Sequence, residues 1–160
     1  MPPAMRVRVR PVSLAGDDVA QMAALYAPYV ADTVVTWEYE APPAAEMARR
    51  VHERVAAGYP YLVAVADSGG EESGGDAADD ARARAARVAG EGRPVADGGA
   101  DGGAVVGFAG CGPFRGRIGY RFAAETSVYI APSQQRRGVG TLLVRSLLDA
   151  MAAGGFRVAI

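Results

Sequence analysis

The sequence predicts a mixed α/β (α+β) domain, because strand patterns and amphipathic helix patterns follow one another along a single chain. The predicted order is a strand, two helices, three strands, a helix and a last strand. A length of 160 residues is enough for one domain with a sizeable core. Half of the residues are hydrophobic, yet no apolar run approaches the ~20 residues that span a bilayer.

The N-terminal part predicts a strand followed by a helix. Residues 5–9 alternate apolar side chains with arginine, which is the period-two pattern of a half-buried strand. Asp17 or Asp18 is expected to cap the helix, and Pro28 to end or kink it near its C-terminus. The apolar residues of this helix recur at helical spacing: Val19, Met22, Leu25, Tyr26 and Tyr29.

A second helix and a second strand precede a segment of unusual composition. The helix is predicted over 44–57, where Gly58 and Pro60 stop it, and residues 61–66 have a strand pattern. The segment 67–103 is rich in Gly, Asp and Ala and cannot offset its ordering entropy by burial. We expect a disordered insertion between two strands, either an inert loop or an acidic regulatory arm.

The C-terminal part predicts two strands, a long helix and a last strand. Residues 104–109 and 121–130 have strand patterns. A helix is predicted over 141–151, because four leucines and a methionine share one face and a glycine pair follows. Residues 156–160 then begin another strand.

Charge is distributed unevenly along the chain. The formal net charge is −1, but the segment 67–103 holds 9 of the 18 acidic residues and only 4 of the 17 basic ones. The remainder is mildly basic, which suits a small phosphorylated ligand. The sequence contains no basic stripe with interleaved aromatics, so it does not indicate nucleic-acid binding. Every basic side chain is arginine, and the absence of lysine excludes a Walker-type phosphate loop.

A glycine-rich stretch, QRRGVG at 135–140, joins the predicted strand 121–130 to the helix that follows. Gly138 and Gly140 would let a phosphate approach the free amides and positive dipole end of that helix. Arg136 and Arg137 would add positive charge. Taken alone, the stretch fits an ordinary turn equally well, and it lacks the third glycine of a dinucleotide-binding fingerprint.

This stretch resembles the Gln/Arg-x-x-Gly-x-Gly/Ala pyrophosphate loop of the GCN5-related N-acetyltransferases. Further stretches are similar to the phosphinothricin and methionine sulfoximine acetyltransferase group, and together they cover nearly the whole chain outside the insertion. They are LYAPYV (25–30), TWEYEAP (36–42), YPYLVA (59–64), VVGFAGCGPFR (105–115) and GYRFAAETSVYI (119–130). The resemblance implies the fold of this superfamily, a mixed, mostly antiparallel central sheet flanked by helices.

The resemblance also implies acetyl-CoA as cosubstrate and no metal. In this superfamily the fourth strand splays from the fifth, and the pantetheine arm pairs with the backbone that is left free. Here that backbone belongs to Val128, Tyr129 and Ile130, although an ordinary central strand is the alternative. The diphosphate would be held at Gln135, Arg136, Arg137, Gly138, Val139, Gly140 and Thr141.

Glu125 stands where phosphinothricin-type members have their proposed general base. The acceptor amine must lose a proton as it attacks the thioester, and a carboxylate can accept this proton directly or through water. An unneeded carboxylate in an otherwise apolar strand is costly. The alternative is a glutamate paired with a nearby arginine. A backbone N–H of the same strand would hold the oxyanion.

The acceptor implied by the resemblance is small and amino-acid-like, and arginine suits its carboxylate. Arg115 and Arg121 match basic positions of methionine sulfoximine-type members, and Arg117 is a third candidate. Each of them, taken alone, also fits a solvated loop charge. Trp37 and Tyr120 fall at positions that line the acceptor site in relatives.

Two other reactive side chains are not expected to be catalytic. Cys111 occupies a small-residue position among glycines, and as the single cysteine it cannot form an internal disulfide. His52 lies on a helix surface among charged residues. Neither has the partners of a triad or of a metal site.

The expected function is transfer of acetyl from acetyl-CoA to the primary amine of an amino-acid-like acceptor. We expect a cytoplasmic protein without a nucleic-acid or membrane partner, since no secretory h-region is visible, and relatives often form homodimers. Relatives continue beyond residue 160, so we interpret 1–160 as a single N-acetyltransferase domain, C-terminally incomplete, without the last helix and strands. The alternative is a catalytically silent remnant that binds acetyl-CoA weakly or not at all.

Overall fold

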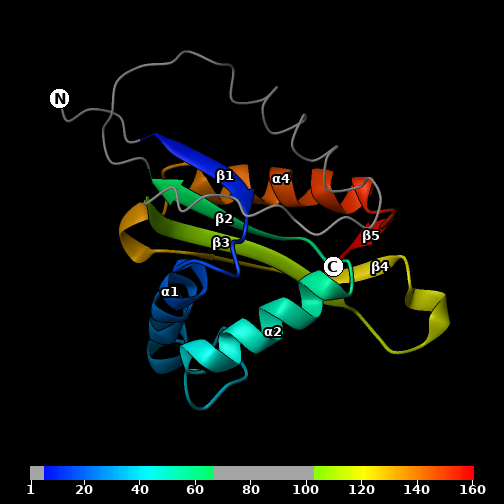
Figure 1. Ribbon diagram of the computed structural model, residues 1–160, viewed down its shortest axis with the longest axis horizontal. Coiled ribbons are helices and arrows are strands. Elements are labelled where there is room, and N and C mark those ends of the chain that lie inside the picture. The colour runs from blue at the N-terminus through cyan, green and yellow to red at the C-terminus, as the bar shows by residue number, and fades with distance from the viewer. Residues whose placement is uncertain (1–5, 67–102) are drawn as a thin grey trace.

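The computed structural model describes residues 6–66 and 103–160 as a five-stranded sheet with helices on both faces (Figure 1). The strands lie side by side in chain order, and the first four pair antiparallel while the last pairs parallel. They are β1 (Val7–Pro11), β2 (Tyr61–Ala66), β3 (Ala104–Pro113), β4 (Ala123–Ile130) and β5 (Val158–Ala159). The predicted mixed, mostly antiparallel sheet is confirmed.

Among the described residues, two helices cover one face of the sheet and one covers the other (Figure 1). Helices α1 (Asp18–Asp32) and α2 (Ala44–Ala56) share a face, and α4 (Val139–Ala153) lies on the opposite one. Neighbouring residues of a strand serve opposite cores because strand side chains alternate: Val63 packs toward α1 and α2, whereas Leu62 packs toward α4.

The start of α1 differs from the expected capping. The side chain of Asp17, the N-cap residue, makes no capping hydrogen bond. The carboxylate of Asp18 is only 5% exposed and accepts hydrogen bonds from the Arg10 guanidinium (2.5 and 2.8 Å) and the Ser13 N–H (2.7 Å). Asp18 therefore joins α1 to the end of β1 instead of capping the helix. Pro28 does not end α1, which continues to Asp32.

Several element boundaries also differ from the sequence-based ones, while β2 is confirmed residue for residue and α2 to within one residue. Strand β3 continues to Pro113, because its backbone pairs with β4 through this part, and its glycines leave room for side chains that lie over the strand. Strand β4 begins at Ala123, after a 3-10 turn (Ile118–Tyr120). Helix α4 begins at Val139, two residues before its predicted start. The predicted last strand is confined to Val158–Ala159.

The predicted insertion at 67–103 lies outside the described residues except for Gly103. It connects β2 to β3, which are antiparallel neighbours with Ala66 paired to Ala104. Within the two described ranges, none of the helices has the length and hydrophobicity that a membrane span requires.

Candidate functional site

The junction between β4 and α4 presents free backbone amides. Gly138 is the N-cap of α4 in a left-handed conformation (φ 83°), and Arg136 is also left-handed (φ 62°). The first hydrogen bond of the helix joins the Leu142 N–H to the Gly138 carbonyl at 3.0 Å. The N–H groups of residues 139–141 therefore have no partner within the helix, and no described side chain caps it.

These amides form a site that can hold an anion. The positive end of the dipole of the 15-residue helix α4 lies at residues 139–141, and the exposed side chains of Arg136 and Arg137 are adjacent. Sequence reasoning placed the helix start at Thr141, so the amides belong to residues slightly earlier than expected. A Cβ on Gly140 would lie 3.8 Å from Ile130 Cγ1, so this glycine faces β4.

The outer edge of β4 is covered along only part of its length. The Thr126 N–H donates to the Ile160 carbonyl (2.7 Å), whereas on the opposite edge the Ala131 N–H donates to Val106 (2.9 Å). Backbone groups alternate along a strand, so those of Val128 and Ile130 point to the outer edge and those of Tyr129 toward β3. Among the described residues, no strand lies beside this part of the edge.

Tyr29 of α1 joins this edge to the junction. Its hydroxyl donates to the Ile130 carbonyl (2.6 Å) and accepts from Gln135 Nε2 (2.9 Å). The Gln135 side chain, expected at the diphosphate, is thus directed toward α1. With the Ile130 carbonyl occupied, the outer edge offers the N–H and carbonyl of Val128 and the N–H of Ile130.

Glu125 projects from β4 on the face covered by α1 and α2. Ala124 packs in the core under α4 and Tyr129 against the opposite core, so strand alternation places Glu125 on the face of Tyr129. The Glu125 side chain is exposed and has no hydrogen bond or ion pair with any described residue. The expected cost of a carboxylate among apolar residues therefore does not arise, and the alternative, an ion pair with an arginine, is not formed with any described residue.

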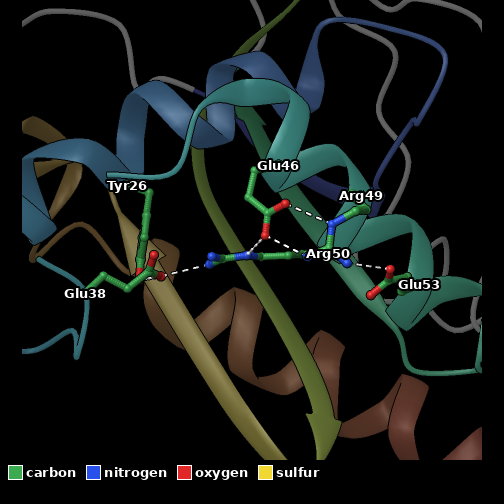
Figure 2. Close-up of polar contacts among 6 residues, drawn as sticks. All are labelled: Tyr26, Glu38, Glu46, Arg49, Arg50 and Glu53. Carbon is green, nitrogen blue, oxygen red and sulfur yellow. Dashed lines mark hydrogen bonds and ion pairs between the residues drawn. The ribbon is translucent and has the colours of Figure 1, made fainter. Parts of the chain in front are cut away.

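The segment between α1 and α2 is held by a polar cluster that sequence reasoning missed (Figure 2). The Arg50 guanidinium of α2 donates to Glu46 (2.7 Å) and to Glu38 Oε1 (2.9 Å), and the Tyr26 hydroxyl donates to the same Glu38 oxygen (3.0 Å). Burial and the bond to Glu38 raise the pKa of Tyr26. The cluster anchors the segment that exposes Trp37, whose side chain is 99% exposed.

Comparison with known proteins identifies the family. The model of the Acetyltransferase (GNAT) family matches residues 63–160, which is more than half of the chain. The chain belongs to this family. A phosphinothricin N-acetyltransferase of Alcaligenes faecalis is 29% identical over 141 residues, covering 88% of this chain and 54% of that protein. Another, from Streptomyces coelicolor, is 45% identical over 49 residues, covering 31% of this chain and 29% of that protein.

Solved structures of the GNAT family share the fold. A GNAT superfamily phosphinothricin acetyltransferase from Sinorhizobium meliloti, crystallised in complex with AcCoA, is 29% identical with a TM-score of 0.69. The match covers 96% of this chain and 64% of that one. The fold and family predicted from the sequence are confirmed. The matched part of the chain spans about half the length, or less, of the Alcaligenes faecalis and Streptomyces coelicolor relatives.

The acceptor residues expected from the family resemblance fall on two separate segments. Arg115, Arg117, Tyr120 and Arg121 all lie exposed in the loop between β3 and β4. The Arg115 guanidinium lies 5.1 Å from the Phe114 ring centroid, which Tyr120 contacts edge-on, and Arg121 lies over a second ring. Arg115 and Tyr120 thus contact the same Phe114 ring and Arg121 contacts a different one, whereas Trp37 makes no ring contact with a described residue of that loop.

Cys111 and His52 lie in the surroundings predicted for them, Cys111 in the core and His52 on a helix surface. Cys111 is 3% exposed in the core under α4, and burial raises the pKa of its thiol to about 11. A thiol that remains protonated at neutral pH is a poor nucleophile. His52 is exposed on α2.

Proposed function

We propose that this chain transfers acetyl from acetyl-CoA to the primary amine of a small amino-acid-like acceptor. The observation that supports this most is the arrangement along β4. Among the described residues, free amides lie just beyond one end of the strand, an uncovered backbone edge follows, and an unpaired carboxylate, Glu125, lies toward the other end. Such an arrangement can bind an elongated ligand with its diphosphate at one end and its reacting group at the other.

The described residues suit acetyl-CoA chemically. A diphosphate requires hydrogen-bond donors and positive charge, which the amides of residues 139–141 and the side chains of Arg136 and Arg137 can supply. The amide-bearing pantetheine arm requires backbone partners, which Val128 and the Ile130 N–H can supply. When bound, acetyl-CoA supplies an acyl group that is activated as a thioester.

Glu125 would act as the general base. The acceptor nitrogen would attack the thioester carbonyl carbon and form a C–N bond. The C–S bond would break with CoA leaving as its thiolate, and the amine would give up a proton. Glu125 would receive this proton directly or through one water, since its exposed carboxylate has no competing partner among the described residues. A backbone N–H at the outer edge of β4 would hold the developing oxyanion.

The nature of the acceptor is inferred from two sources. The relatives named above are phosphinothricin acetyltransferases, and phosphinothricin is an anionic amino acid. The β3–β4 loop of this chain presents Arg115, Arg117 and Arg121 with Tyr120, and the α1–α2 segment presents Trp37. We therefore expect a small acceptor with an anionic group recognised by these arginines.

Two measurements on the purified chain test the proposal. We expect saturable binding of acetyl-CoA in a titration, and release of CoA thiol that requires L-phosphinothricin or methionine sulfoximine. Binding with thiol release at background would contradict the reaction and favour the catalytically silent alternative. Absence of any saturable binding would contradict the whole assignment of the junction.

A further inference from the structure

The guanidinium of Arg54, on the last turn of α2, lies over β3 beside Glu125. A Cβ on Gly112 would overlap Arg54 Nη1, so this guanidinium fills the space above the glycine. Gly112 is the register partner of Glu125, and paired residues project to the same face of a sheet. Paired Cβ atoms lie about 5 Å apart, which places the guanidinium close to the Glu125 side chain.

Arg54 differs from the other arginines of α2 in having no counter-ion among the described residues. Arg49 forms ion pairs with Glu46 (2.8 Å) and Glu53 (2.6 Å), and Arg50 is paired with Glu46 and with Glu38 of the α1–α2 segment. No carboxylate among residues 6–66 and 103–160 lies within 4.0 Å of the Arg54 guanidinium. Its charge is therefore available on the face that the proposed base occupies.

The two unpaired charges match the two charged groups of an α-amino acid. Its amine and carboxylate are bonded to one carbon atom, so a ligand with its amine at Glu125 has its carboxylate nearby. A guanidinium binds a carboxylate through two parallel hydrogen bonds, which fix orientation as well as affinity. The arginines of the β3–β4 loop then remain for the distal end of the acceptor.

We propose that Arg54 binds the α-carboxylate of the acceptor and thereby directs the α-amine toward Glu125. The inference rests on the proposed function and narrows its substrate class to α-amino acids, as opposed to simple amines. Arg54 determines specificity in this proposal, and Gly112 acts through Arg54 because any side chain at 112 would displace the guanidinium.

Kinetics with two acceptors test the proposal, L-phosphinothricin and its decarboxylated analogue, 3-aminopropyl(methyl)phosphinate. Arg54→Gln should raise the KM for phosphinothricin roughly 10- to 100-fold, the effect of losing a charge-assisted pair, and leave the KM for the analogue unchanged. Arg54→Lys should show a smaller loss, and Gly112→Ala should reproduce Arg54→Gln. The control Arg49→Gln, on the same helix but paired elsewhere, should alter neither KM.

Binding without turnover separates this inference from the proposed function. Broadening of the ³¹P resonance of phosphinothricin on addition of the protein reports binding without acetyl-CoA. Broadening that Arg54→Gln abolishes, in a chain that releases no thiol, would support the carboxylate site while contradicting the reaction. Equal KM increases for both acceptors, or broadening unchanged by both Arg54→Gln and Arg54→Lys in variants with native circular dichroism, would overturn the inference.

Discussion

The polar groups around α1 have hydrogen-bond or ion-pair partners, whereas those along the proposed site lack them among the described residues. Around α1, Asp18 is bonded to Arg10 and to a backbone amide, and the Tyr29 hydroxyl bonds both β4 and Gln135. Along the proposed site, Glu125, Arg54 and the amides of residues 139–141 have no such partners among the described residues. The first set is mostly buried or half-buried, whereas Glu125 and Arg54 are exposed.

This difference separates groups that hold the fold from groups that are available to a ligand. A buried charge without a partner is strongly destabilising, so the groups around α1 must be paired for the chain to fold. Exposed charges are solvated and can exchange water for ligand atoms at little cost to stability. Substitutions around α1 should therefore change stability, and substitutions along the site should change binding or turnover.

The largest expected effect is on turnover, from Glu125→Gln. Losing a general base should lower kcat/KM about 10²- to 10⁴-fold in a thiol-release assay. The urea midpoint should stay unchanged, because the side chain is exposed and unpaired. Glu53→Gln, an exposed glutamate of α2, is the control and should retain full turnover. A Glu125→Gln variant with normal kcat/KM would contradict the assignment of the base.

Asp18→Asn should produce the largest loss of stability. The substitution leaves the Arg10 guanidinium without its charged partner in a buried position, where breaking an ion pair costs about 3 kcal/mol. Urea unfolding measures the change in the free energy of unfolding. Acetyl-CoA affinity of the folded fraction should be unaltered. A loss of affinity without a loss of stability would contradict the assignment of Asp18 to the groups that hold the fold.

The same ion pair predicts how stability depends on pH. Burial alone would raise the pKa of Asp18, but the Arg10 guanidinium and the Ser13 N–H outweigh it and hold the pKa below its usual value. The contribution to stability is thus complete above the unfolded-state pKa of about 4 and is lost as pH falls through the folded-state pKa. In Asp18→Asn, the free energy of unfolding should fall less steeply below about pH 4 than in the unchanged protein.

Gly138→Val should weaken acetyl-CoA binding. Placing a β-branched residue at a φ of 83° costs about 2 kcal/mol, which corresponds to a loss of affinity of roughly 30-fold if the junction shifts to relieve the strain. Gly58→Val is a matched control, because Gly58 has a φ of 84° at the end of α2 with no atom near its missing Cβ. Equal loss of affinity in both variants would show that strain alone, and not the position of the amides, causes the effect.

The smallest effect is expected from Tyr29→Phe, at the boundary between the two regions. Removing the hydroxyl breaks the two hydrogen bonds that hold the β4–α4 junction to α1, and each such hydrogen bond contributes about 1 kcal/mol to its position. We expect acetyl-CoA affinity to fall about 5-fold, measured by titration, with Tyr39→Phe as a fully exposed control. Unchanged affinity would show that the junction keeps its shape without Tyr29.

Local patterns predicted most of the elements and part of the candidate site. Alternating and helical hydrophobic spacing is a property of neighbouring residues, so β2 and α2 were found within one residue. The glycine-rich junction was also recognised locally, although α4 begins two residues before the predicted start. The extension of β3 was missed because its glycines are poor strand formers, while the pairing with β4 that extends it depends on residues from another part of the chain.

The amino-acid sequence by itself determined the order of the elements, the glycine-containing start of α4 and the position of Glu125 on a strand, since each depends on residues that are close in the chain. Only the tertiary structure decided the contacts between polar groups that are distant in the chain. Tyr29 meets Ile130 and Gln135 across 101 and 106 positions, and Arg54 meets Gly112 from another element. Such contacts depend on sheet register and helix packing, which bring distant residues together and leave Arg54 and Glu125 on one face without ion pairs among the described residues.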